Sequence, residues 1–149
     1  LFRKSAWRCC SAAQLTQQTS IQGSWQDHIE HVRAKGVLAK QLYVIFTTPT
    51  GGIDALKQHL GEHLAYQKDL EARGITFAAG PFADDSETDW SGEGMIIVRA
   101  GSVAEATTIA QADPMHRSGV RRFRVRPWLL NEGSYTVTVR YSEQHRSVL

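Results

Sequence analysis

Two helical stretches alternate with four short apolar runs in this chain, and their order limits the folds that it can adopt. The helical stretches cover residues 53–73 and 102–113, where apolar side chains recur at helical spacing. The runs are rich in β-forming residues and lie at residues 41–48, 75–79, 94–100 and 120–130. The resulting order, β-α-β-β-α-β, is the split βαβ plan of an α+β domain, which packs two helices on one face of a four-stranded sheet.

The ends of both predicted helices carry local signals. Gly74 closes the first helix, and Ser102 with Glu105 forms a capping box that opens the second. Pro114 ends the second helix, because the residue before a proline is biased away from helical backbone angles. The apolar stripe expected to face the core from the first helix contains Ile53, Leu56, Leu60, Leu64 and Leu70.

The last apolar run has two different faces. Phe123 and Val125 alternate with Arg122, Arg124 and Arg126, which is typical of a strand in a sheet with one wet face. Helices on only one side leave the other side of the sheet uncovered. We therefore expect a homodimer in which two sheets pack face to face.

Length, charge and cysteine content exclude several classes of protein. With 149 residues, the chain is expected to form one domain. Its net charge of +2 does not indicate nucleic-acid binding, and the acidic stretch at residues 83–94 argues against it. The only cysteines, Cys9 and Cys10, are adjacent, which excludes a disulfide framework and a CxxC-type zinc site. We expect a reducing compartment, the cytoplasm, and no membrane span.

The chain divides into three parts. Residues 1–40 form an N-terminal extension, residues 41–130 form the predicted domain, and residues 131–149 form a C-terminal tail. The run at residues 135–139 of the tail is suited to an additional edge strand.

The N-terminal extension combines a biased segment with a predicted helix. Residues 1–23 contain basic but no acidic side chains. They are compatible with a mitochondrial transit peptide or with an extension that carries no function. Ser24 is placed to cap a helix at about residues 25–35, and Gly36 ends it.

Two ionisable residues lie on the apolar stripes of different predicted helices. His63 belongs to the first helix, and Asp113 ends the second. An ionisable side chain facing a core is costly unless it meets a partner, so the two residues mark a candidate pocket. An imidazole titrates near neutrality and a neighbouring carboxylate fixes its tautomer, which suits His63 as a general base and Asp113 as the residue that orients it.

The structural alternative for this pair is that His63 is a satisfied core histidine and Asp113 merely caps the turn at Pro114. A carboxylate at a helix C-terminus meets the unfavourable end of the helix dipole. Asp113 is therefore harder to explain as a device for stability than as a site residue.

Five further residues are candidate substrate contacts, namely His59, Pro81, Trp90, His116 and Ser118. His59 lies one turn before His63, so the two are spaced to ligate a metal, but no third ligand has a diagnostic spacing and we expect no metal. Trp90 belongs to an acidic solvated loop or, alternatively, to a lid over an aromatic ligand. His116 and Ser118 follow Asp113 closely enough to line the same rim. Ser118 has no Gly-x-Ser-x-Gly context, so a serine hydrolase is unsupported.

Arginines gather near the end of the predicted domain. They are suited to an anionic ligand, although arginines on a strand face more often pair with acids or solvent. The group consists of Arg117, Arg121, Arg122, Arg124 and Arg126.

Several short motifs occur in an order that is typical of one protein family. They are His63-Leu64, Ala79-Gly80-Pro81, Asp113-Pro114, Gly119 and Arg126-Pro127-Trp128. On these motifs the chain, from about residue 41 to residue 130, resembles the YciI-like (YCII-related) family. The resemblance implies a ferredoxin-like α+β fold, usually a dimeric α/β barrel, with a pocket that holds the family's His and Asp. These two map onto His63 and Asp113. A similar protein is a dehydrochlorinase acting on a chlorinated hydroxyhydroquinone.

These observations predict a small-molecule enzyme in which His63 and Asp113 abstract a proton from a small hydroxylated cyclic substrate without a cofactor. The most specific form of this hypothesis, based on analogy with that protein, is a dehydrochlorinase-like lyase. The alternative from another class is a noncatalytic dimer that binds a small ligand or serves as a protein-interaction module.

Overall fold

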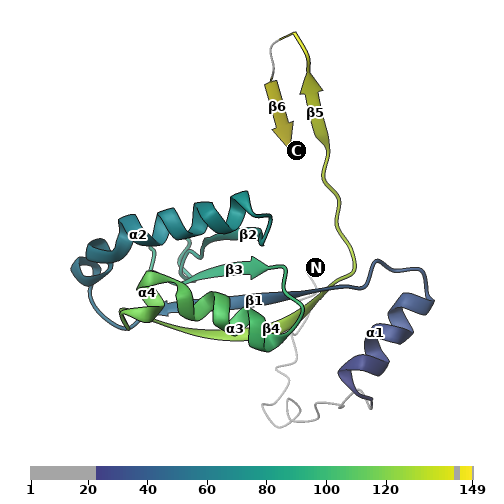
Figure 1. Cartoon of the computed structure of the whole chain (residues 1–149), viewed down its shortest axis with the longest axis horizontal. Coiled ribbons are helices and arrows are strands. Elements are labelled where there is room, and N and C mark those ends of the chain that lie inside the picture. The colour runs from purple at the N-terminus through teal and green to yellow at the C-terminus, as the bar shows by residue number, and fades with distance from the viewer. Residues whose placement is uncertain (1–22, 143–144, 149) are drawn as a thin grey trace, which may run out of the picture.

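An antiparallel sheet of four strands forms the centre of the chain, with the strand order β2-β3-β1-β4 (Figure 1). The computed structural model describes residues 23–142 and 145–148. The strands are β1 (Lys40–Pro49), β2 (Thr76–Pro81), β3 (Gly94–Val98) and β4 (Arg121–Leu130). The predictions made for residues 1–22, including the transit peptide and both cysteines, lie outside the described residues.

Helices α2 (Ile53–Ala72) and α3 (Val103–Ala112) join the strands in the order β1-α2-β2-β3-α3-β4. A short helix, α4 (Pro114–Arg117), follows α3. The structure confirms the expected α+β, ferredoxin-like fold.

Alternate residues of the strands build the main core on the face that carries the helices. Tyr43 and Ile45 of β1 and Val98 of β3 pack against Ala106 and Ala110 of α3. The small alanine side chains let α3 lie close to the sheet. Phe123 and Val125 of β4 join this core, so the helix-facing side of β4 is the one that the alternation predicted.

The inward face of α2 differs from the expected leucine stripe. Leu56 and Leu70 are buried, but Ile53, Leu60 and Leu64 are 58%, 44% and 48% exposed. Between Leu56 and Leu70, the half-buried positions include three polar side chains with hydrogen bonds to the α3–α4 segment, namely His63, Tyr66 and Gln67. The expectation for Ile53, Leu60 and Leu64 was wrong because α2 turns its polar residues inward to reach buried polar partners.

Two strands extend past the ends of the predicted runs at residues 48 and 79. β1 includes Pro49, and β2 continues through Gly80 and Pro81. β2 lies at the edge of the sheet, where a residue without a backbone N–H is tolerated.

The N-terminal helix α1 spans Trp25–Ala34 and has a complete capping box formed by Ser24 and Asp27. Ile29 of α1 packs against Ala39 and Leu129, with Val32 beside them. This contact attaches α1 to the far end of β4.

Strands β5 (Val137–Arg140) and β6 (His145–Val148) pair with each other in a separate two-stranded sheet. The tail therefore adds no edge strand to the four-stranded sheet in the described chain. Figure 1 shows this hairpin standing away from the domain. Within residues 23–142 and 145–148, no helix combines the length and the apolar character needed to cross a membrane.

Candidate functional site

His63 on α2 and Asp113 at the end of α3 meet on the helix-covered side of the sheet. The ring Nδ1 of His63 lies 2.9 Å from Oδ1 and 2.8 Å from Oδ2 of Asp113. Because an ionised carboxylate only accepts, Nδ1 carries the hydrogen and donates it. In a neutral imidazole with its hydrogen on Nδ1, the lone pair lies on Nε2.

Asp113 is 1% exposed, and three groups donate hydrogen bonds to its carboxylate. Besides His63, these are Nε2 of Gln67 at 2.9 Å from Oδ2 and the backbone N–H of Met115 at 2.9 Å from Oδ1. The side chain of His63 is 21% exposed, so the pair joins a buried carboxylate to an imidazole that solvent reaches.

Asp113 occupies two helix ends at once. It follows the last residue of α3 and is also the N-cap of α4, with Pro114 in the first helical turn. The C-terminus of α3 disfavours the negative charge of Asp113, as expected. The N-terminus of α4 favours the same charge and so offsets this effect. Asp113 caps α4 and contacts His63, so the structural and the functional interpretations of this residue are compatible.

The pKa of Asp113 lies below its ordinary value. Burial opposes ionisation, but the hydrogen bond from His63, the N–H of Met115 and the charges that His63 and His116 carry when protonated together outweigh it. Asp113 is therefore ionised near neutrality. Burial and the charge of Asp113 raise the pKa of Tyr66, whose hydroxyl donates to the carbonyl of Ile109 at 2.8 Å.

A second polar network begins at His116, three residues after Asp113. Its Nδ1 lies 2.8 Å from the carbonyl oxygen of Ala110, so Nδ1–H donates there. Its Nε2 lies 2.8 Å from Oγ1 of Thr47, which also accepts a hydrogen bond from Nε of Arg121 at 2.8 Å. The lowered pKa of His116 favours its neutral form, and in that form the Thr47 hydroxyl donates to Nε2.

Burial lowers the pKa of both His116 and Arg121, and for His116 it outweighs the hydrogen bond to Ala110 and the charge of Asp113. The guanidinium of Arg121 also donates to the carbonyl of Gly92, at the base of the acidic loop. A Cβ atom at Gly92 would lie 2.5 Å from Cγ of Pro49, so only glycine fits there. The network thus connects α4, β1, β4 and this loop.

The other predicted contacts are distributed over several elements. His59 is half-buried one turn before His63 on α2, and Pro81 is exposed at the end of β2. Trp90 is 55% exposed, and its indole N–H donates to the carbonyl of Glu93. Ser118 follows α4 and donates to the carbonyl of Met115. The structure thus brings His63, Asp113 and His116 into one region, while the side chains of Trp90 and Ser118 bond within their own loops.

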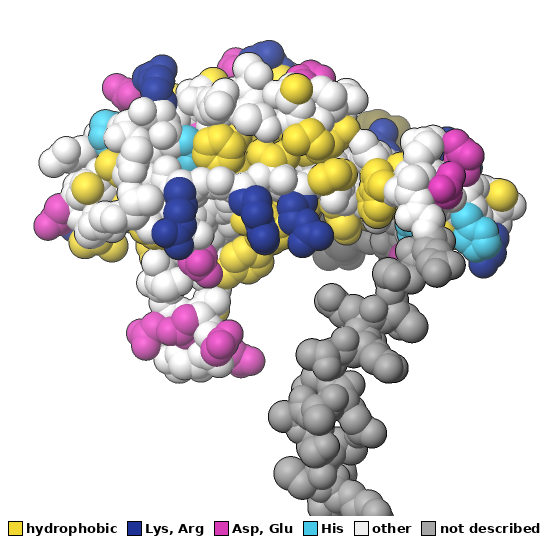
Figure 2. Space-filling view, turned by 90° about the horizontal axis from the view of Figure 1, so that it is seen from below, with side chains coloured by type: hydrophobic (Ala, Val, Ile, Leu, Met, Phe, Trp, Pro, Cys, Tyr) yellow, Lys and Arg dark blue, Asp and Glu magenta, His cyan; other side chains and the backbone are white. Residues whose placement is uncertain are grey.

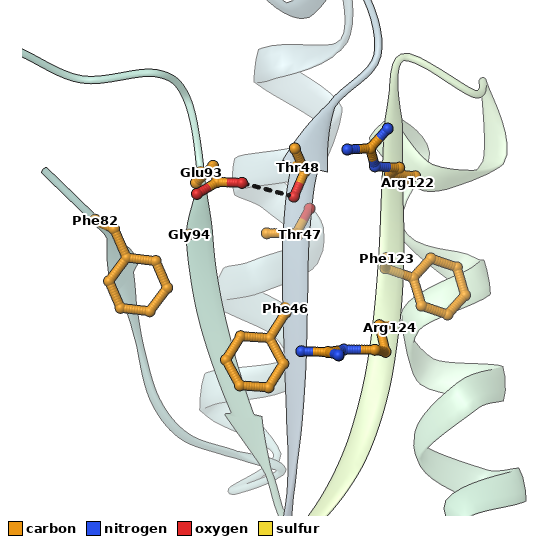
Figure 3. Close-up of a pocket in the computed structure, with 9 residues that line it drawn as sticks. All are labelled: Phe46, Thr47, Thr48, Phe82, Glu93, Gly94, Arg122, Phe123 and Arg124. Atoms are coloured by element: carbon orange, nitrogen blue, oxygen red, sulfur yellow. Dashed lines mark hydrogen bonds between the residues drawn. The ribbon is translucent and has the colours of Figure 1, made fainter. Parts of the chain in front are cut away.

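A hollow of about 400 Å³ opens on the other side of the sheet. Phe46, Phe82, Glu93, Arg122 and Arg124 contribute to its lining. In Figure 3 the side chains of this face lie in front of the strands and the helices lie behind them. None of the seven predicted site residues lines this hollow, which is separate from the His63–Asp113 pair.

Gln67 and Thr47 belong to these networks but were not among the predicted site residues. Gln67 lies four residues after His63, so helical spacing was a signal that both side chains share a face. Thr47 is a buried polar residue that alternates with Tyr43 and Ile45 on the helix-facing side of β1. The predicted arginine group is also divided, because Arg121 faces the helices, whereas Arg122 and Arg124 line the hollow on the other side.

No cluster of three or more His, Cys, Asp or Glu side chains with metal-binding geometry occurs in the part of the chain that the structure describes. The imidazole Nδ1 of His63 faces the Asp113 carboxylate.

The fold and this site define a class: ferredoxin-like α+β proteins with an imidazole held by a buried carboxylate. The family model of the YCII-related domain matches residues 41–129, so the chain belongs to this family, as its motifs predicted. No curated protein matches the chain.

One solved structure with a similar fold is the 5-chloro-2-hydroxyhydroquinone dehydrochlorinase from Burkholderia phenoliruptrix, in complex with 2,5-dihydroxybenzoquinone. It shares 22% sequence identity with this chain, with a TM-score of 0.48. The match covers 58% of this chain and 92% of the dehydrochlorinase chain.

Proposed function

We propose that this protein is a cofactor-independent enzyme in which His63 abstracts a proton from a small hydroxylated cyclic substrate. The observation that carries the proposal is the contact of His63 Nδ1 with both carboxylate oxygens of the buried Asp113. Such a partner fixes the tautomer that leaves Nε2 able to accept a proton, and it stabilises the imidazolium that forms. Membership of the YCII family supports a small-molecule reaction.

Asp113 suits the orienting role rather than that of the base. Its lowered pKa makes it a weak proton acceptor near neutrality, and its oxygens are engaged by His63, Gln67 and Met115. His63 is partly exposed, and the structure records hydrogen bonds to described residues for its Nδ1 alone. The proton acceptor is therefore Nε2 of His63.

The reaction type that we propose is a lyase reaction, with dehydrochlorination as its most specific form. His63 removes a proton from the substrate, and the electron pair of the broken bond moves into the ring system. A leaving group such as chloride departs from the ring with its own bonding pair. The substrate thus loses one proton and one anion, and no oxidant or reductant is consumed.

We propose His59 and Pro81 as direct substrate contacts. Trp90, His116 and Ser118 stay candidates for such contacts. For His116 we favour a supporting role, because both of its ring nitrogens are already hydrogen-bonded within the protein. The uncovered sheet face supports a further part of the proposal, a homodimer that buries this face.

The test is a turnover assay of purified protein with chlorinated and unchlorinated hydroxyhydroquinones, monitored by chloride release and ultraviolet absorbance. We expect His63→Gln to lower turnover by about 10² to 10⁴-fold. His31→Gln is the matched control, since it changes an exposed histidine on α1 that is neither a member of the pair nor a proposed substrate contact. Full turnover in His63→Gln would refute the mechanism.

A binding role without turnover is the competing outcome of the same experiment. Ligand binding by calorimetry that depends on His63, combined with no turnover of any compound, would indicate a noncatalytic ligand-binding module instead of an enzyme.

A further inference from the structure

Two arginines and a phenyl ring form the β4 side of the hollow on the open sheet face. Phe46 of β1 pairs with Arg124 of β4, and two residues further along, Thr48 pairs with Arg122. Paired residues of neighbouring strands project from the same face of a sheet, and so do residues two positions apart. Figure 2 shows basic side chains in a row beside a band of hydrophobic side chains. Positive charge and aromatic surface therefore border the hollow together.

The charges of Arg122 and Arg124 are not neutralised by a neighbouring acid. Both side chains are exposed, and among the described residues neither takes part in an ion pair. The guanidinium carbon of Arg124 lies 5.1 Å from the centroid of the Phe46 ring, a contact that holds the group at the edge of the hollow. A guanidinium presents its N–H donors in a planar fork that matches a carboxylate. The two arginines are therefore suited to bind a carboxylate from solution.

Phe82 and Glu93 form the opposite side of the hollow. The backbone N–H of Phe82 donates to the carbonyl of Glu93 at 3.0 Å, which extends the pairing of β2 with β3 by one residue. The register of β1 and β3 places Glu93 beside Thr48, whose hydroxyl donates to Oε1 of Glu93 at 3.2 Å. For Oε2 of Glu93, the structure records no donor among the described residues. This oxygen is therefore available to accept a hydrogen bond from a ligand.

Strand β1 lies between the positive and the negative side of the hollow. Arg122 on β4 and Glu93 next to β3 belong to the two neighbours of β1, so their backbones are about 10 Å apart at the usual strand spacing of about 4.8 Å. One aromatic ring with a polar group at each end can span this gap. Figure 3 shows Phe46 and Phe82 bordering the same space. Its volume of about 400 Å³ is typical of a site for a small molecule.

We propose that this hollow is a second binding site, which takes a hydroxylated aromatic monocarboxylate such as 4-hydroxybenzoate. The carboxylate binds Arg122 and Arg124, and the hydroxyl group at the other end of the ring donates to Glu93. The ring packs against Phe46 and Phe82. Two positive charges and one negative charge line the hollow, so one positive charge is in excess and a monoanion balances it.

The inference goes beyond the proposed reaction, because the hollow does not include the catalytic pair. His63 and Asp113 lie on the helix-covered side of the sheet, and neither lines the hollow. All residues of the proposed site come from one chain. A second copy packed on this face would cover the site, but it is not needed to form it.

The experiment is a titration of ¹⁵N-labelled full-length protein with 4-hydroxybenzoate, followed through the backbone amide signals of Thr48 and Glu93. We expect both signals to shift with a dissociation constant on the order of 0.1 to 1 mM, as is usual for so small a ligand. Two related compounds separate the contributions. 4-Hydroxybenzamide keeps the shape without the charge and binds at least about tenfold more weakly. 4-Hydroxycyclohexanecarboxylate keeps the charge without the aromatic ring and binds at least about threefold more weakly.

The test variant is Arg122→Gln with Arg124→Gln, and we expect it to bind 4-hydroxybenzoate at least about tenfold more weakly than the wild type. Arg126→Gln is the matched control, because it changes an exposed arginine on the same face of β4 that does not line the hollow. We expect its affinity to stay within about twofold of the wild type. His63→Gln is expected to keep the same affinity. The amide spectrum of each variant also shows whether it is folded.

Three results would overturn the second site. The amide signals of Thr48 and Glu93 could stay in place up to 10-fold above the expected dissociation constant, or the acid and the amide could bind equally well. Shifts that are confined to residues around His63 and disappear in His63→Gln would place the ligand at the catalytic pair instead. None of these results decides the enzymatic proposal, which the turnover assay tests separately.

Discussion

His63 Nδ1 lies within 2.9 Å of both carboxylate oxygens of Asp113, although the two residues are 50 positions apart in the chain. Asp113 at the same time accepts the N–H of Met115 and caps α4. The carboxylate that orients the imidazole is therefore itself held by backbone, and its position depends on the junction between α3 and α4. Catalytic geometry and local stability are coupled at this residue.

Replacement of Asp113 tests this coupling. Asp113→Asn keeps the size of the side chain but removes the charge that stabilises an imidazolium at His63. In the substrate assay we expect turnover to fall by on the order of 10² to 10⁴-fold. If Asp113→Asn kept the turnover of the wild type while His63→Gln lost it, Asp113 would have no part in orienting the base.

The lowered pKa of Asp113 predicts a loss of stability in acid. An unfolded aspartate has a pKa of about 3.9, and the folded pKa lies below that value. As pH falls through the interval between them, the unfolded state binds more protons, so the free energy of unfolding decreases. The contribution of Asp113 is therefore complete above about pH 4 and is lost below it.

Urea unfolding of wild type and Asp113→Asn between pH 2.5 and pH 6 measures this contribution. Other carboxylates titrate in both proteins, so the difference between the two isolates Asp113. We expect the stability difference to shrink as the pH falls. A difference that stays constant over the range would contradict the lowered pKa.

A substitution at Gln67 tests how a second negative charge beside Asp113 changes the stability of the protein. Its Nε2 donates to Oδ2 of Asp113 at 2.9 Å, and Gln67→Glu replaces this donor by a second carboxylate. We expect a loss of about 1 to 3 kcal/mol of stability at neutral pH, because two neighbouring buried carboxylates repel. The loss shrinks on acidification, because one carboxylate of the pair takes up a proton. Thermal unfolding at pH 7 and pH 5 measures both effects, and Gln67→Leu controls for the lost hydrogen bond alone.

Protonation of His116 is predicted to lower the free energy of unfolding. Its folded pKa lies below the ordinary value of about 6.5, mainly because of burial. As pH falls below about 6.5, protons bind first to the unfolded state, so the free energy of unfolding decreases until the folded pKa is passed. Protonation also removes the acceptor at Nε2 that the Thr47 hydroxyl uses.

Unfolding of His116→Phe tests this prediction. Phenylalanine preserves an aromatic contact with Phe123, whose ring centroid lies 4.8 Å from that of His116, but it makes neither hydrogen bond. We expect a loss of about 1 to 3 kcal/mol at pH 7.5, and a weaker dependence on pH between about 5 and 6.5. An unchanged pH dependence would mean that His116 does not titrate as inferred.

Substitutions at two leucines of α2 distinguish the observed orientation of this helix from the expected one. Leu70 is 2% exposed and Leu64 is 48% exposed, although both belonged to the predicted apolar stripe. Leu70→Ala is expected to cost about 2 to 5 kcal/mol in urea unfolding, whereas Leu64→Ala is expected to cost less than about 1 kcal/mol. Equal losses would contradict the orientation of α2.

Much of the secondary structure could be predicted because its signals are local. Gly74, Ser102 and Pro114 lie at or next to helix ends, and the alternation of Phe123 and Val125 with arginines separates the two faces of β4. Within the candidate site, the apolar stripes of two predicted helices and then the family motifs indicated that His63 and Asp113 belong to one pocket. Their catalytic role stays a prediction.

Other features could not be predicted because they depend on partners far apart in the chain. Asp113 had appeared to end one helix, but its position before Pro114 also let it begin another. Thr47, Arg121 and His116 meet only after β1, β4 and α4 have packed together. Nothing in the local pattern of any one of them indicates that contact.

The order of strands and helices follows from local signals in the chain, because periodicity and capping act over a few neighbouring residues. The side of α2 that faces the sheet depends instead on contacts between residues far apart in the chain. A leucine stripe would bury more apolar surface, but the carboxylate of Asp113, once buried, requires hydrogen-bond donors, and His63 and Gln67 supply them from α2. The need to satisfy one buried charge thus decided the orientation of the helix and, with it, the geometry of the candidate site.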